Sequence, residues 1–170
     1  MLSSISEVVF TSGATEAAAV LARLPVGTVE VDPTAHDCLW SQRREGQGAR
    51  ALAWGYANNE TGIIAEAPAR AAGEPLLLDI VQAVGKVPFS FAWSGADMAI
   101  LSAHKFGGPK GVGALIIRDG VETQPVLTGG GQEMGRQSGV VTQWLGAFVA
   151  PSLERGINEM LRPLAARYDS

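Results

Sequence analysis

The chain has 170 residues, enough to bury the core of one domain. Apolar residues make up 46% and charged residues 18%, which excludes an intrinsically disordered chain. The formal net charge is −4 and the 13 basic residues are scattered, so we expect no nucleic-acid or anionic-membrane partner. No apolar run reaches membrane-spanning length and the first residues do not resemble a signal peptide, so we expect a cytoplasmic protein.

Short apolar runs alternate with helix-forming segments along the chain. The runs predict strands at 8–11, 29–31, 51–56, 76–78, 98–101 and 114–117. Helices are expected at 14–24, 35–44, 65–72 and about 143–167, the last one interrupted near Pro151 and Pro163. Unbroken apolar runs are typical of strands that are buried on both faces. The pattern predicts a single α/β domain over 1–170, with a mostly parallel sheet flanked by helices.

Ligands of such sheets bind beyond the carboxyl ends of the strands, where Ser12, Asn59, Asp79 and Ser102 are expected. Asp79 ends an apolar strand, and a carboxylate is costly to bury there without a partner. The ring nitrogen of pyridoxal phosphate is one such partner, because an aspartate keeps that nitrogen protonated. A turn or helix-capping aspartate is the alternative interpretation.

Lys105 follows an expected strand and precedes the glycine-rich stretch 107–111. Glycines let the backbone pass close to a flat ligand, and a partly desolvated lysine can form a Schiff base with a carbonyl carbon. Taken alone, Lys105 is better explained as a solvated loop lysine.

The turn 12–15 lies between an expected strand and an expected helix, where N–H groups and the Thr15 hydroxyl can bind an anion. Ser102 and His104 can add donors to that site. The ring of His36 can stack on a planar cofactor, and Gln82 can donate to one of its oxygens. Each of these side chains can also be an ordinary surface residue.

The segments that carry a family resemblance follow one another in chain order. They are FTSGATE (10–16), AHD (35–37), ANNETG (57–62), DIVQAVGK (79–86), SAHKFGGPKG (102–111) and GGGQE (129–133). Together they resemble the cysteine desulfurases of the class V aminotransferase family. The lysine segment and the ANNETG segment are the most specific of these matches.

The resemblance implies the large domain of a fold-type I, pyridoxal-phosphate-dependent transferase that forms a homodimer. It implies two catalytic residues, with Lys105 holding the cofactor as a Schiff base and His36 stacking on its ring. Asp79 would pair with the pyridine nitrogen. The other cofactor-binding residues would be Gln82 and Asn59 at the phenolate oxygen, and Ala14, Thr15, Ser102 and His104 at the phosphate.

The same resemblance implies an activity that mobilises sulfur from L-cysteine, gives L-alanine and passes a persulfide to an acceptor protein for iron–sulfur cluster assembly. The family's sulfur-accepting cysteine and substrate-binding arginine belong to a smaller C-terminal domain, which we do not find in this sequence. Cys38 does not match that position and is expected to be a packing residue. Arg136 is either a substitute for the arginine or an ordinary loop residue.

Within the glycine-rich segment, Met134, Gln137 and Val140 stand where the family has arginine, arginine and threonine. Valine has no hydroxyl to donate to the phosphate of a partner subunit. Three hypotheses therefore stay open. The chain is an active desulfurase or a related lyase or transaminase, a non-catalytic remnant that acts through a partner, or a shortened form of a longer protein.

Overall fold

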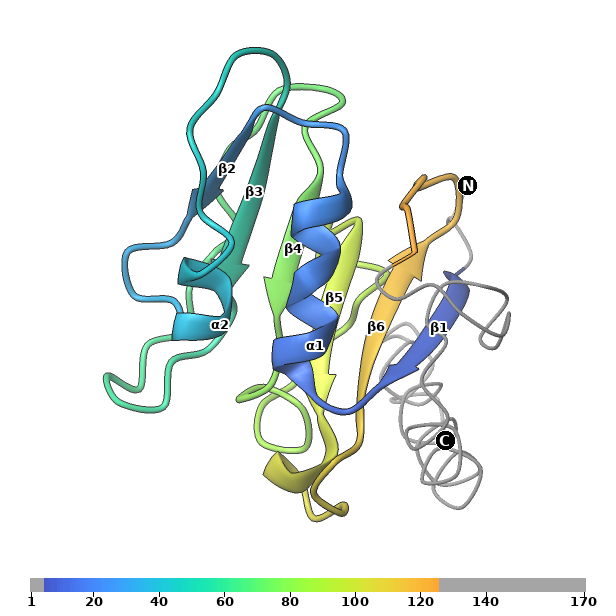
Figure 1. Cartoon of the computed structure of the whole chain (residues 1–170). Coiled ribbons are helices and arrows are strands. Elements are labelled where there is room, and N and C mark those ends of the chain that lie inside the picture. The colour runs from blue at the N-terminus through green and yellow to red at the C-terminus, as the bar shows by residue number, and fades with distance from the viewer. Residues whose placement is uncertain (1–4, 126–170) are drawn as a thin grey trace.

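The computed structural model describes residues 5–125, in which six strands form one mixed sheet (Figure 1). The sheet order is β1-β6-β5-β4-β3-β2. The strands are β1 (Ile5–Thr11), β2 (Thr28–Val31), β3 (Arg50–Gly55), β4 (Leu76–Asp79), β5 (Met98–Ser102) and β6 (Gly113–Arg118). Strands β2 to β5 pair in parallel, and β6 is antiparallel to β1 and β5. The prediction of an α/β fold with a mostly parallel sheet is confirmed, and all six expected strands are present.

The sheet is covered on both faces, which explains the unbroken apolar runs in the sequence. Successive side chains of a strand point to opposite faces. Leu77 and Met98 accordingly belong to one core cluster, while Leu76, Leu78 and Ala99 belong to the other. Neither cluster is open to water, so the positions of β4 and β5 that belong to the clusters are apolar. The polar residues Asp79 and Ser102 stand at the carboxyl ends of these strands.

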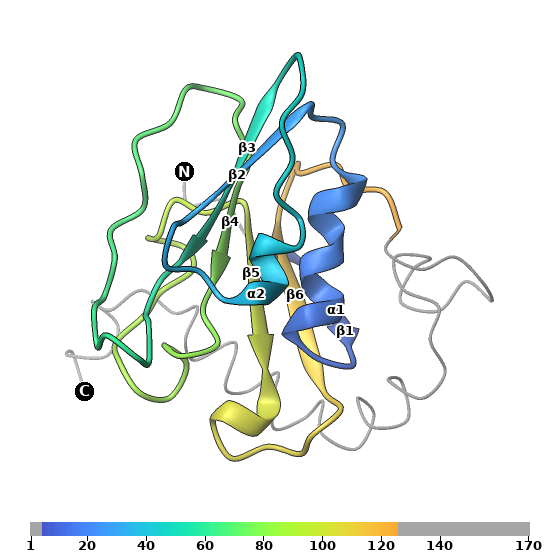
Figure 2. The same cartoon turned by 60° about the vertical axis from the view of Figure 1, so that its left-hand side comes forward.

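Two short helices and a 3-10 turn cover one face of the sheet (Figures 1 and 2). Helix α1 (Ala14–Ala18) continues into a 3-10 turn (Ala19–Arg23) and packs against β5 and β6. Helix α2 (Asp37–Trp40) packs against α1. The helix expected at 14–24 is therefore present, but its second half is a 3-10 helix. The helix expected at 35–44 spans only Asp37–Trp40.

The prediction of a helix at 65–72 is wrong, because the structure has no helix there. The Ala65 N–H donates to the Tyr56 carbonyl at 2.9 Å, so this segment begins by pairing with the chain after β3. Ala57 and Ile64 form an isolated bridge in the same pairing. Pro68 has no N–H to give to a helical ladder. The alanine-rich composition favours a helix, but these contacts prevent one. The helix expected at 143–167 and the segment 129–133 lie outside the described residues.

Strands β1, β3, β4 and β5 all end at the same edge of the sheet. Gly55 pairs with Asp79, while Gly113 lies opposite both Thr11 and Ser102. This register brings the loops that follow four different strands to one place. The loops are 12–13, 56–62, 80–86 and 103–111, and they hold Ser12, Asn59, Gln82, His104 and Lys105.

Candidate functional site

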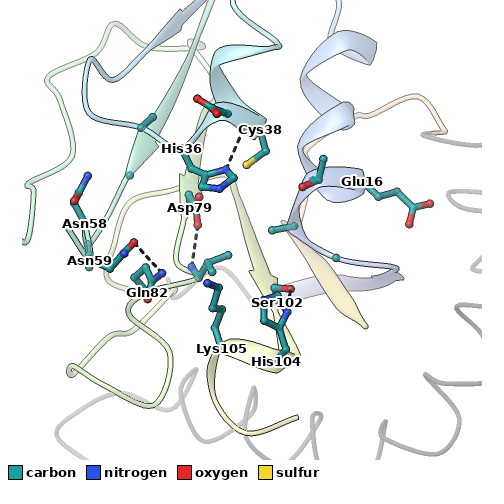
Figure 3. Close-up of a pocket in the computed structure, with 18 of the residues that line it drawn as sticks. Glu16, His36, Cys38, Asn58, Asn59, Asp79, Gln82, Ser102, His104 and Lys105 are labelled. Carbon is teal, nitrogen blue, oxygen red and sulfur yellow. Dashed lines mark hydrogen bonds between the residues drawn. The ribbon is translucent and has the colours of Figure 1, made fainter. Parts of the chain in front are cut away.

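A cavity of about 810 Å³ opens at this carboxyl edge of the sheet (Figure 3). Its volume suits a small-molecule ligand or cofactor. All nine residues that the sequence predicts for a binding site line it: Ala14, Thr15, His36, Asn59, Asp79, Gln82, Ser102, His104 and Lys105. They come from five separate stretches of chain, and the fold brings them all together.

Asp79 is the last residue of β4 and faces the cavity. Among the described residues, one hydrogen bond reaches its carboxylate, from the Val81 N–H to Oδ1 at 2.9 Å. Loss of water around the carboxylate raises the pKa of Asp79, while the Val81 hydrogen bond and nearby His36 act in the opposite direction. A desolvated carboxylate with one hydrogen bond is suited to bind a protonated nitrogen.

His36 lies next to Asp79 in the cavity (Figure 3). Its Nδ1 accepts a hydrogen bond from the Cys38 N–H at 3.1 Å and so caps helix α2. Because Nδ1 is the acceptor, Nε2 carries the proton of the neutral ring. The cap fixes the orientation of a ring that is otherwise exposed.

The turn before His36 is held by Asp32, a buried carboxylate that our sequence reasoning missed. Oδ1 of Asp32 accepts from the Thr34 N–H at 2.8 Å and from the Thr34 hydroxyl at 2.9 Å. Oδ2 accepts from the Gly55 N–H at 3.2 Å, which ties this turn to the end of β3. The signal was present in the sequence, since an aspartate two residues before a threonine at a strand end is typical of an Asx turn.

Lys105 ends a 3-10 turn (Ala103–Lys105) that follows β5 directly. Its side chain is exposed and points into the cavity toward the side where Asp79 lies (Figure 3). The chain after Lys105 folds back closely, because a Cβ on Gly108 would lie 2.7 Å from Cβ of Ala103. That close packing fixes the backbone on both sides of Lys105.

Another side of the cavity is rich in hydrogen-bond donors. The N–H groups of Ala14 and Thr15 begin helix α1 and have no intrahelical acceptor. Ser102 is buried, and its hydroxyl lies 3.0 Å from Nδ1 of His104. The Ser12 N–H is occupied by the Glu16 carboxylate at 2.6 Å. The remaining donors form a set that suits an anionic group.

A pair of side-chain amides lies across Lys105 from Ser102 and His104 in Figure 3. Nε2 of Gln82 donates to Oδ1 of Asn59 at 3.0 Å. Lys86 donates to Oε1 of the same Gln82 amide. Lys86 was part of a matching segment in the sequence, but its sequence position gave no indication of this contact.

Cys38 lies in the core cluster between the sheet and the helices and borders the cavity. Burial raises the pKa of Cys38 to about 11, and the negative charge of Asp79 acts in the same direction. The thiol is therefore protonated at neutral pH and is a poor nucleophile. This environment agrees with the expected packing role.

Residues 5–125 hold neither a metal-binding cluster nor a membrane-spanning helix. No group of three or more His, Cys, Asp or Glu side chains is placed to hold a metal ion there. No described helix has the length and apolar character needed to cross a membrane. Arg136, Met134, Gln137 and Val140 lie outside the described part of the chain.

The fold is that of an α/β protein with a cavity at the carboxyl edge of its sheet. Residues 41–143 match the family model for class-V aminotransferases, which is more than half of the chain. The chain belongs to the class V aminotransferase family.

The relatives point to one branch of that family. Cysteine desulfurase 2 of Trichormus variabilis is 51% identical over 89 residues, which cover 49% of this chain and 22% of that protein. A cysteine desulfurase of a Frankia species is 41% identical over 134 residues, covering 75% of this chain and 30% of the relative. A solved NifS-like protein superimposes with a TM-score of 0.72 at 29% identity, covering 91% of this chain and 54% of that one. The chain is thus cysteine desulfurase-like and spans less than a third of these curated relatives.

Proposed function

We propose that this chain binds pyridoxal 5'-phosphate through Lys105 and belongs to a cysteine desulfurase that takes sulfur from L-cysteine. The observation that carries the proposal is the position of Lys105 in one cavity with Asp79. A lysine amine and a desolvated carboxylate are the two groups that such a cofactor requires at its aldehyde and at its ring nitrogen.

The residues of the cavity fit this cofactor. Asp79 has a raised pKa and accepts a single hydrogen bond within residues 5–125, so a protonated ring nitrogen would supply a positive partner. The N–H groups at the start of α1, with Ser102, suit a phosphate. The exposed ring of His36, whose orientation is fixed by its cap, suits stacking.

In this proposal each residue has one task when the cofactor is bound. The cofactor supplies an electron sink that stabilises negative charge next to its ring. Lys105 Nζ would hold it covalently, and His36 Nε2 would be available to move a proton at the substrate. Asp79 keeps the ring nitrogen protonated. Gln82 and Asn59 hold the phenolate side, and Ala14, Thr15, Ser102 and His104 hold the phosphate.

One observation favours a second candidate, in which the chain binds the cofactor without turning over cysteine. No arginine is among the residues that line the described cavity, and its one cysteine is protonated. A desulfurase needs a cation for the substrate carboxylate and a reactive thiol for the sulfur. Arg136, another part of the protein or a partner subunit would have to supply these groups.

The wider arrangement follows from the same proposal. Residues 1–170 would form a single large domain, and two copies would pair as a homodimer. L-cysteine or another amino acid would be the substrate, and a sulfur-acceptor protein would receive the persulfide in the cytoplasm.

Two assays separate the candidates. Adding pyridoxal phosphate to the purified chain should produce a visible absorbance band that is absent in Lys105→Ala. Incubation with L-cysteine and a thiol should then release alanine and sulfide if the chain is a desulfurase. A band without turnover would favour the non-catalytic candidate, and no band would refute the proposal.

A further inference from the structure

A series of hydrogen bonds, each donating to the next residue, runs from the surface into the cavity. It begins at Lys86, which is exposed and does not line the cavity, passes through Gln82 and ends at Asn59. Gln82 and Asn59 both line the cavity, whereas Lys86 reaches it only through Gln82.

Lys86 sets the donor-to-acceptor direction of this series of hydrogen bonds. An ammonium group has three donors and no acceptor, so the atom of the Gln82 amide that it contacts has to be the oxygen. The amide nitrogen of Gln82 therefore faces Asn59, whose oxygen accepts at 3.0 Å. Asn59 then has its own amide nitrogen left over as a donor. Without Lys86, the two orientations of the Gln82 amide would be far closer in energy.

Gln82 and Asn59 therefore both present amide N–H donors, and the ammonium group of Lys86 contacts the Gln82 oxygen. Gln82 has a second N–H and Asn59 has two, none of them used by the contact between the two amides. A charge-assisted bond to the Gln82 oxygen also strengthens the N–H groups of the same amide as donors. Such a pair favours an anionic oxygen over a neutral one.

We infer that Lys86 is a positioning residue, which orients the amides of Gln82 and Asn59 so that they donate to an anionic oxygen of the bound ligand. The inference rests on the proposed function, in which that oxygen is the phenolate of pyridoxal phosphate. Lys86 acts through Gln82 and does not itself touch the ligand.

The test compares Lys86→Met with Lys86→Arg in the full chain. Methionine keeps much of the length but has no donor, whereas arginine keeps both the charge and the donors. Arg43→Met is the matched control for lost charge, since Arg43 is exposed, pairs with Glu45 and does not line the cavity.

The first measurement needs no cofactor. The Gln82 Nε2 proton that Asn59 accepts, followed by NMR, should exchange with water about 5-fold faster in Lys86→Met, because an amide that is no longer held by Lys86 makes this hydrogen bond less often. Lys86→Arg and Arg43→Met should match the wild type. Unchanged exchange in Lys86→Met would overturn the inference, whatever the cofactor does.

The second measurement follows the absorbance band of bound pyridoxal phosphate with pH. Removing a nearby positive charge disfavours the deprotonated form, so the midpoint of the spectral change should rise by roughly 0.5 pH unit in Lys86→Met. An unshifted midpoint with normal binding would overturn the inference and leave the proposed function intact. If the wild type gives no band, the proposed function fails, and the amide exchange still decides whether Lys86 orients Gln82.

Discussion

Gly113 offers a direct test of how the sheet positions the site. It is the first residue of β6 and lies opposite both Thr11 and Ser102, the last residues of β1 and β5. A Cβ at this position would lie 2.6 Å from the Gly13 Cα and 2.7 Å from the Leu101 carbonyl oxygen. Both are backbone atoms, so no side-chain rotation can relieve the contact.

Gly113→Ala should therefore force the turn at Gly13 away from the sheet. Overpacking of a tight core costs about 1–3 kcal/mol, and we expect about 3 kcal/mol here because only backbone can move. The displaced turn carries the N–H groups of Ala14 and Thr15, so affinity for pyridoxal phosphate should fall as well. Urea unfolding followed by circular dichroism measures the first effect, and titration of the cofactor absorbance measures the second.

Gly13→Ala is the matched control for stability. Gly13 has an extended backbone and a Cβ there would lie 3.7 Å from Ser102 Oγ, an ordinary contact distance. Its cost should stay within about 1 kcal/mol, the usual range for a change at a helix N-cap. Equal unfolding free energies for the two variants would refute this account of how the turn is held.

Three further predictions concern the same framework. Asp79→Asn should raise the thermal midpoint of the cofactor-free chain at pH 7 and weaken cofactor binding. The folded state holds the Asp79 proton more tightly than the unfolded chain, so the wild type should lose stability as the pH rises above about 4, the ordinary pKa, and the Asn variant should not. Asp32→Ala should cost about 2–3 kcal/mol, because it leaves the Thr34 and Gly55 N–H groups without their acceptor, and should broaden the NMR signals of the His36 ring; a sharp ring signal would contradict this. Leu77→Ala should cost about 2–5 kcal/mol in urea unfolding, since Leu77 is fully buried in the central strand β4, and a loss below about 1 kcal/mol would contradict its core role.

The strands were predictable because the physical signal was strong. The runs at 76–78, 98–101 and 114–117 are buried on both faces, so every residue in them has to be apolar. The helices were harder to predict, because contacts with other segments determine where they end. Helix α2 begins after a histidine cap that pattern alone does not reveal, and Pro68 together with the Ala65 pairing excludes a helix at 65–72.

The members of the site were predictable, but the interactions that orient them were not. Polar residues at the carboxyl ends of parallel strands have to meet at one edge, so Asp79 and Ser102 could be placed in a site. The contacts of Asp32 with Gly55 and of Lys86 with Gln82 depend on side-chain directions, which the sequence pattern does not encode.

Borohydride reduction of the chain with pyridoxal phosphate, followed by peptide mass spectrometry, tests the central claim most directly. Three lysines are available, Lys86, Lys105 and Lys110, and Lys110 also lines the cavity. The account predicts a single stoichiometric adduct on Lys105, which Lys105→Ala abolishes without moving it to another lysine. A stoichiometric adduct on Lys86 or Lys110, or no adduct at all, would contradict it.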